Sequence, residues 1–173
     1  MKFGLQYYPY HWPEEQWAAD AAKMRQAGVK YVRMGDLGWS AYERRQGQLE
    51  FEWMDRAIDL FGAVGIKTVM CTCSRTPPPW LYRTKPGMLP VDREGVTRHS
   101  DGRYAVALAH LEFSVEALRI DESVIRHFSG NDHIIAWQID NEIGCHSDCY
   151  CDHCLSEFHL YLKNKYKTPD ELN

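Results

Sequence analysis

The sequence predicts an α/β fold with a parallel sheet, because short apolar runs alternate with segments of helical periodicity along the chain. The junctions at 27–32 and 64–69 repeat one order of residue types: small or apolar, Gly, apolar, Lys, any residue, Val. Four strand–helix units can be counted in the chain. A complete (β/α)8 TIM barrel needs about 250 residues, so we expect these 173 residues to form the amino-terminal half of one. A self-contained α/β domain with four strands is the structural alternative.

Four strands and four helices are expected to follow one another along the chain. The strands are predicted at 3–8, 30–34, 67–71 and 134–139, and the helices around 14–28, 54–65, 113–128 and 158–167. Apolar residues in the helical segments recur at spacings of three and four, and the first two helices end at a Gly. In the last helix, Phe158, Tyr161 and Leu162 are expected to form the buried face.

The connections between these elements also carry signals. The loop at 35–47 contains Asp36 and Glu43, with room for one helical turn. A much longer connection spans 76–102, where three consecutive prolines exclude an interior strand or helix. Connections of this length are usually functional or disordered. At the end of the chain, Thr168 as the N-cap with Pro169 behind it predicts the start of another helix.

The stretch 134–143, IIAWQIDNEI, is the part of the chain most suggestive of a site. Its apolar run predicts a strand buried on both faces, and the run stops at Asp140, Asn141 and Glu142. Parallel α/β folds place their chemistry at the carboxyl ends of strands, where these three side chains would lie. A plain polar turn is the alternative interpretation.

Composition limits the classes of function. The formal net charge of −4, with both signs interspersed, provides no basic surface for nucleic acid and no polybasic patch for membranes. The amino terminus lacks the apolar region of a secretory signal, and no stretch is long enough to span a membrane. Four of the six cysteines fall within 145–154, too close together for a disulfide framework, so a reducing cytoplasm is expected. Six Trp and ten Tyr are numerous enough to provide platforms for sugar rings as well as core packing.

Several stretches, in order along nearly the whole chain, carry a resemblance to a known family. They are FGLQYYPYHWP, RMGDLGWSAYE, FEWMDRAIDL, TPPPWL followed by LPVD, IIAWQIDNEIGCH and CYCDHC. The sequence resembles the amino-terminal part of glycoside hydrolase family 42, retaining β-galactosidases of bacteria and archaea. The resemblance implies that residues 1–173 are a partial (β/α)8 catalytic domain, truncated after the fourth βα unit. It also implies hydrolysis of terminal non-reducing β-D-galactose residues in β-D-galactosides.

The resemblance implies roles for three residues. Glu142 corresponds to the acid/base carboxylate, Asn141 to the amide that contacts the 2-hydroxyl of the sugar, and Arg103 to an arginine that contacts galactose. An acid/base group needs a raised pKa, and we expect Asp140 and the strand containing Trp137 to provide its setting. The family's nucleophile comes from a later strand, so this chain alone is expected to be inactive.

The chain departs from the family pattern at three positions. Tyr10 and Asp36 each stand where many members have Glu, and Ala107 stands in a segment that is commonly Cys-Pro-Asn. The last change removes one potential zinc ligand and an amide. These departures concern the details of the substrate pocket more than the class of reaction.

The cysteine cluster resembles the structural zinc site of the family. Thiolates separated by one and two residues, as in Cys149, Cys151 and Cys154, can converge on one tetrahedral ion. Cys145, His146, His153 or water could complete the site, and an empty reduced cluster is the alternative. For Cys71 and Cys73 we expect a place in the core or at a strand end.

Two other functions compete with the enzyme. One is a zinc-stabilised binding module, which the missing basic surface and the single Cys-x-x-Cys element disfavour; the other is a non-catalytic fragment. The expected partner is a small or oligomeric β-galactoside, with no nucleic acid and no membrane. An open four-stranded sheet also favours self-association into a homo-oligomer, aggregation or pairing with a complementary half.

Overall fold

The computed structural model describes residues 3–99, 105–142, 144 and 148–173. Its centre is a parallel sheet with the order β1-β2-β3-β4, so each strand pairs with the next one in the chain. The strands are β1 Gly4–Gln6, β2 Tyr31–Met34, β3 Lys67–Cys71 and β4 Ile134–Gln138. This order confirms the predicted repetition of strand–helix units, and the carboxyl ends of all four strands meet at one edge.

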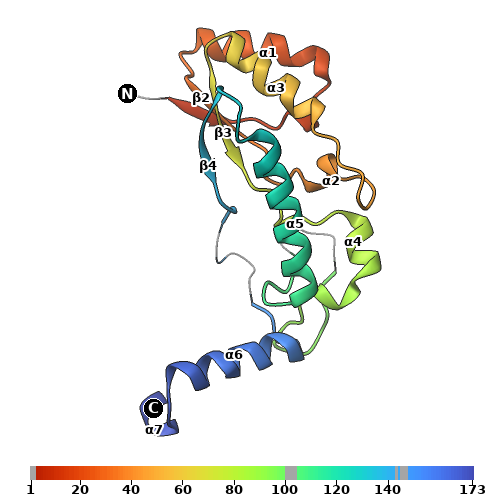
Figure 1. Ribbon diagram of the computed structural model, residues 1–173, viewed down its shortest axis with the longest axis vertical. Coiled ribbons are helices and arrows are strands. Elements are labelled where there is room, and N and C mark those ends of the chain that lie inside the picture. The colour runs from red at the N-terminus through yellow and green to blue at the C-terminus, as the bar shows by residue number, and fades with distance from the viewer. Residues whose placement is uncertain (1–2, 100–104, 143, 145–147) are drawn as a thin grey trace.

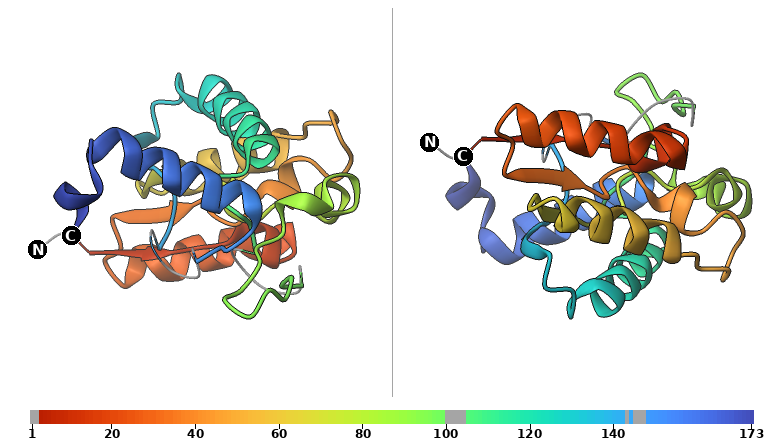
Figure 2. Two further views of the ribbon diagram at one scale, coloured as in Figure 1. Left: turned by 90° about the horizontal axis from the view of Figure 1, so that it is seen from below. Right: turned by 90° about the horizontal axis from the view of Figure 1, so that it is seen from above.

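The larger helices are α1 Glu14–Gln26, α3 Glu52–Ala63, α5 Leu111–Phe128 and α6 Asp152–Lys165. Short helical segments lie between them and at the end of the chain: η1 Pro9–His11, α2 Trp39–Tyr42, α4 Pro79–Thr84, η2 Pro86–Met88 and α7 Pro169–Leu172. Seen along the long axis, α1, α3 and α5 follow one another in chain order beside the strands (Figure 2). No helix in the described part of the chain is long and apolar enough to cross a membrane.

Alternation along the strands decides which face of the sheet is covered. Val32, Met34 and Met70 are buried in one core with apolar side chains of α1, α3 and α5. Their neighbours Tyr31 and Arg33 point to the opposite face and are only partly buried. The helices therefore cover one face of the sheet, as in the wall of a barrel, and leave the other face open.

Two expected burial patterns are wrong. The strand β4 is not buried on both faces: Ile135 is 50% exposed, and Ile139, directly after the strand, is 66% exposed. The helices cover one face of the sheet only, and β4 lies at its edge. Helix α6 buries none of its residues, and Phe158 and Tyr161 are about half exposed. In Figure 1, α6 and α7 extend away from the sheet and the other helices. An apolar pattern marks a face that favours burial, but packing partners decide whether it is buried.

The proline run lies outside any strand or helix interior, as expected. Helix α4 begins at Pro79, in the first turn, where a missing N–H costs no intrahelical hydrogen bond. The prediction for the end of the chain is confirmed: the side chain of Thr168 accepts a hydrogen bond from the backbone N–H of Glu171 at 3.3 Å and caps α7.

Candidate active site

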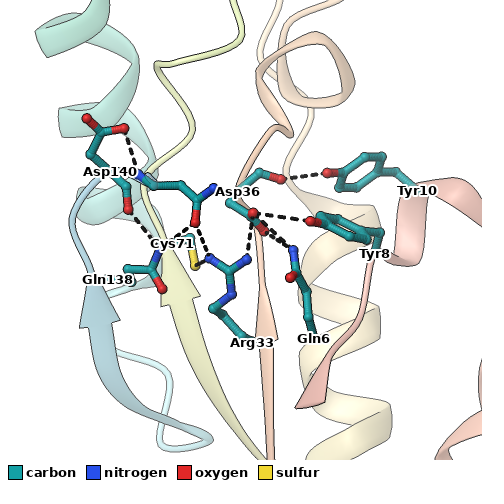
Figure 3. A network of polar contacts seen from close by, with 9 residues as sticks. Gln6, Tyr8, Tyr10, Arg33, Asp36, Cys71, Gln138 and Asp140 are labelled. Atoms are coloured by element: carbon teal, nitrogen blue, oxygen red, sulfur yellow. Dashed lines mark hydrogen bonds and ion pairs between the residues drawn. The ribbon is translucent and has the colours of Figure 1, made fainter. Parts of the chain in front are cut away.

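Polar side chains from the carboxyl ends of three strands form one connected group, which we call the strand-end network (Figure 3). Its members come from β1 and the loop after it, from β2 and its loop, and from the end of β4 and the residues behind it. They are Gln6, Tyr8, Tyr10, Arg33, Asp36, Gln138, Asp140 and Asn141. Arg33 Nη1 also lies 3.8 Å from the Sγ atom of Cys71, at the end of β3 (Figure 3). Parallel strands bring these positions together because all their carboxyl ends lie at one edge.

Arg33 is the bridge across this network. Its Nη2 donates to Asp36 Oδ2 at 2.9 Å, and its Nη1 donates to Asn141 Oδ1 at 3.0 Å. The guanidinium fork can hold both partners because its donors diverge in one plane. Arg33 therefore ties the loop after β2 to the residue beside Glu142, which is 108 positions away from it in the chain.

Asp36 is the buried anchor of the network, with a side chain 1% exposed. Besides Arg33, its carboxylate accepts hydrogen bonds from Gln6 Nε2 at 3.1 Å and from the Tyr8 hydroxyl at 3.3 Å. The Tyr10 hydroxyl donates to its backbone oxygen at 2.6 Å. A buried carboxylate needs such donors to offset its lost hydration.

The turn into Asp36 depends on Gly35. Its φ of +100° lies in the left-handed region, and a Cβ there would meet the backbone oxygen of Cys71 at 3.0 Å. Glycine lets the chain leave β2 sharply and pass close to the end of β3. This close approach places Asp36 over the strand ends.

The backbone behind β4 is held in an uncommon conformation. Asp140 has φ +59° and Glu142 has φ +52°. Asp adopts this left-handed region more readily than most residues, whereas Glu rarely does. The backbone N–H of Asp140 donates to Thr72 Oγ1 at 2.8 Å, and its side chain lies 3.5 Å from Arg75. Its Oδ1 also accepts from the Asn141 N–H at 2.7 Å. Strained backbone of this kind concentrates at functional sites, where surrounding contacts hold it in place.

Asn141 has a fixed amide orientation, whereas Glu142 stands at the surface. The Asn141 Oδ1 atom accepts from both Arg33 and Gln138, so both lone pairs of that oxygen are used. Glu142 is exposed, and the buried setting expected for it is not provided by the residues that the structure describes. The strand with Trp137 lies partly buried beneath it. Of the other predicted site residues, Arg103 and Cys145 lie outside the described residues.

Cys149, Cys151 and Cys154 meet at the start of α6, with their sulfur atoms all within 4.8 Å of one another. Sulfur atoms on one tetrahedral zinc lie about 3.8 Å apart, given Zn–S bonds of about 2.3 Å. The cluster can therefore close on a metal ion with small side-chain movements. Among the described residues, no other His, Cys, Asp or Glu joins this group, so His153 is not placed as the fourth ligand. His146 lies outside the described residues.

The protonation of the cluster is uneven. Burial would raise the pKa of the Cys149 thiol, but backbone N–H groups of Cys151 and Val91 and the neighbouring thiols outweigh it and lower the pKa. Burial and the other two sulfur atoms raise the pKa of Cys154 to about 12. The Cys149 thiolate is therefore the first ligand ready to bind a metal.

The cluster is also attached to the long connection. The Val91 N–H donates to Cys149 Sγ at 3.4 Å, and the Tyr150 N–H donates to the Val91 backbone oxygen at 2.8 Å. His153 Nε2 lies 2.7 Å from the backbone oxygen of Ala109. A metal here would fasten the connection between β3 and α5 to the start of α6.

A second charged network was not foreseen from the sequence; we call it the loop anchor. Glu43, fully buried after α2, accepts from Trp39 Nε1 at 2.9 Å and from the Gly47 N–H at 2.7 Å. Arg119 of α5 donates one amino group to both of its oxygens, at 2.7 and 3.0 Å, and also pairs with Glu116 at 2.8 Å. The sequence placed Glu43 in a loop, where a solvated carboxylate is the ordinary expectation.

Comparison with known proteins gives a consistent result over nearly the whole chain. The model of glycoside hydrolase family 42, described as beta-galactosidase, matches residues 6–173. Beta-galactosidase Bga of Halorubrum lacusprofundi is 39% identical over 175 residues, covering 100% of this chain and 25% of the relative. A beta-galactosidase of Thermus thermophilus is 41% identical over 172 residues, covering 98% of this chain and 27% of the relative.

Solved structures give the same picture. The polyextremophilic beta-galactosidase from H. lacusprofundi superposes with a TM-score of 0.94 at 39% identity, over 100% of this chain and 26% of that one. The beta-galactosidase from the psychrophilic Marinomonas ef1 superposes with a TM-score of 0.93 at 38% identity, over 100% and 27%. These relatives are TIM barrels, so the α/β fold with four parallel strands corresponds to half a barrel. The chain spans about a quarter of the length of the curated relatives it matches.

Proposed function

The chain belongs to glycoside hydrolase family 42, and on that premise we propose that it forms the acid/base half of a retaining β-galactosidase barrel. The reaction is hydrolysis of terminal non-reducing β-D-galactose residues in β-D-galactosides. The observation that carries the proposal is the Asn141–Glu142 pair behind β4, in a chain whose match to this family spans residues 6–173.

In this proposal Glu142 protonates the leaving oxygen and later activates water. Asn141 beside it binds the 2-hydroxyl of the sugar, and Arg103 contacts the galactose. Support for the role of Asn141 comes from its oxygen, which Arg33 and Gln138 hold, so that its NH₂ group has one defined direction. The left-handed backbone at Glu142 supports a functional reason for its placement.

The proposal can be tested in a chimera in which residues 1–173 replace the equivalent quarter of the H. lacusprofundi enzyme. We expect the chimera to hydrolyse nitrophenyl β-galactosides. Glu142→Gln should slow cleavage most for substrates with poor leaving groups, because these need a proton from the acid. Azide should restore turnover of substrates with good leaving groups, since it attacks the galactosyl intermediate without needing a base.

The matched control is Glu15→Gln, which makes the same change at an exposed position of α1. It should leave the kinetics unchanged. Equal loss of activity on every substrate in Glu142→Gln, without rescue by azide, would show that Glu142 has a structural role.

We propose further that the nucleophile lies outside this chain. Retaining enzymes hold two carboxyl groups about 5–5.5 Å apart, while Asp36 is enclosed by its donors and Asp140 is paired with Arg75. The purified chain should therefore not hydrolyse a nitrophenyl β-galactoside by itself. Activity of the chain alone that disappears in Glu142→Gln would contradict this.

For the cysteine cluster we propose a structural zinc ion held by Cys149, Cys151 and Cys154, with Cys145 as the fourth ligand. Their reduced thiols favour a cytoplasmic location. Elemental analysis of protein purified under reducing conditions should find close to one zinc per chain, and chelation should lower the melting temperature. Cys151→Ser should remove the zinc, whereas Cys73→Ser should retain it. A folded, reduced sample without zinc would overturn the proposal.

A further inference from the structure

A pocket beside the strand-end network lies between the loop after β1, the start of α1, helix α2 and the start of α3. Its volume is about 230 Å³, and four aromatic residues line it: Tyr10, Trp12, Trp17 and Trp53. The charged residues Glu14 and Arg44 also line it. We call it the aromatic pocket. Its volume exceeds the about 30 Å³ of one water but falls below the about 300–1,000 Å³ of pockets for drug-sized ligands, which suits one sugar ring.

The walls of the aromatic pocket are fixed by contacts within the protein. Trp17 Nε1 donates to the backbone oxygens of Pro9 at 3.1 Å and Trp12 at 3.2 Å, which pins the loop that carries Trp12. Tyr10 packs edge-to-face on Trp53, with ring centroids 5.7 Å apart. The pocket is therefore formed before any ligand arrives, which reduces the entropic cost of binding.

One feature of the pocket is unusual for a surface with no ligand. The Trp12 side chain is 50% exposed, although the aromatic surface of Trp favours burial. An exposed indole face provides a flat apolar platform on which a ring can lie.

The charges of the pocket select the class of ligand. Arg56 holds both oxygens of Glu14, at 2.6 and 2.8 Å, so Arg44 is the charged group left at the rim. Arg44 disfavours a cation, and the negative faces of the aromatic rings disfavour an anion, so the pocket favours a neutral ligand. The Arg44 guanidinium can donate hydrogen bonds to hydroxyl groups, while the aromatic rings cover an apolar face. A neutral ring with one apolar face and several hydroxyls is a pyranose.

From this arrangement we infer that the aromatic pocket is a second saccharide-binding site, separate from Asn141 and Glu142, which holds one neutral pyranose ring against Trp12. The inference rests on the proposed function only for the choice of a galactoside as the first probe. Its link to the strand-end network is Tyr10, which lines the pocket and donates to the backbone oxygen of Asp36.

The test is a titration of the ¹⁵N-labelled chain with methyl β-D-galactopyranoside and methyl β-D-glucopyranoside, followed through the indole N–H signals. We expect millimolar binding of at least one glycoside, with the largest shift at Trp12 Nε1–H, because the sugar ring lies against this indole. Trp12→Ala should weaken binding about tenfold, the equivalent of about 1.4 kcal/mol for loss of the stacking ring. Arg44→Ala, at an exposed position, provides a second variant that should also weaken binding if Trp12→Ala fails to fold.

Two controls separate this site from the proposed active site. Tyr161→Ala removes another ring that is about half exposed, on α6, and should leave the affinity unchanged. The double variant Asn141→Ala/Glu142→Gln should also retain binding at the aromatic pocket, even if the proposed catalytic roles are wrong. Binding that is lost in this double variant and kept in Trp12→Ala would overturn the inference. So would the absence of shifts with both glycosides, or shifts produced only by a proline-rich peptide.

Discussion

The strand-end network and the loop anchor are built from the same chemistry but differ in what surrounds them. Each has an arginine that pairs with a buried carboxylate: Arg33 with Asp36, and Arg119 with Glu43. In the loop anchor every hydrogen bond to the Glu43 carboxylate comes from a structural group, namely the Trp39 indole, a backbone N–H or Arg119. In the strand-end network the arginine also reaches an amide beside an exposed carboxylate.

This difference shows how to separate structural from functional ion pairs. Glu43 is fully buried and joins α2, the turn at Gly47 and α5, so its loss should disturb the fold. Arg33 instead donates one of its hydrogen bonds to Asn141, at the proposed active site. Its loss should disturb the geometry of the site more than the stability of the chain.

The largest expected effect is from breaking the loop anchor. Glu43→Ala leaves Trp39 Nε1 and the Gly47 N–H without their acceptor and leaves Arg119 with Glu116 alone. Breaking a buried pair by removing one partner costs 3–5 kcal/mol; because Arg119 is 36% exposed, we expect about 3 kcal/mol. Urea denaturation followed by circular dichroism measures this loss. A change below about 1 kcal/mol would show that the pair acts like a surface salt bridge.

The second prediction exchanges arginine for lysine in each network. Lysine keeps the charge but cannot reach two partners with a planar fork. In the chimera, Arg33→Lys should keep the pair with Asp36, release Asn141 and lower kcat/KM about tenfold, equivalent to about 1.4 kcal/mol. Arg119→Lys should leave kcat/KM nearly unchanged and lower the free energy of unfolding by about 1 kcal/mol. The same effect of both variants on activity would remove the distinction between the networks.

A smaller effect is expected from the Tyr8 hydroxyl, which donates to Asp36 at 3.3 Å. Tyr8→Phe removes one of several donors to this carboxylate and retains the ring. The free energy of unfolding should fall by about 0.5–1 kcal/mol, as measured by urea denaturation. A loss comparable with that of Glu43→Ala would mean that Asp36 depends on this donor far more than the geometry indicates.

The smallest expected effect is on the cysteine beside Arg33. Burial, reinforced by the charge of Asp36, raises the pKa of the Cys71 thiol to about 11. The thiol stays protonated at pH 8, and its thiolate is about 100-fold scarcer than that of a cysteine with a pKa of about 9. Iodoacetamide at pH 8 should therefore label Cys149 in the metal-free chain and spare Cys71, as peptide mass mapping can show.

The raised pKa of Cys71 also predicts that the free energy of unfolding falls as the pH rises from about 9 to about 11. In this range the thiol ionises in the unfolded chain but stays protonated in the folded one.

The sequence by itself determined the local elements. Alternating apolar runs and Gly stops located the four strands, and β3 has the predicted bounds. Local chemistry also determined the Thr168 cap and the approach of three thiols that lie within six residues. These features depend on neighbours in the chain, so periodicity and spacing are sufficient to find them.

Only the tertiary structure decided which faces are covered and which distant groups meet. Periodicity predicted that β4 and α6 have apolar faces, but burial requires a packing partner, and Ile135 and Phe158 lie exposed among the described residues. The contact of Arg33 with Asn141 and the burial of Glu43 against Arg119 join segments 108 and 76 positions apart. No local sequence pattern predicts such pairs. The sequence around a charged loop residue looks the same whether its side chain is solvated or belongs to a buried network.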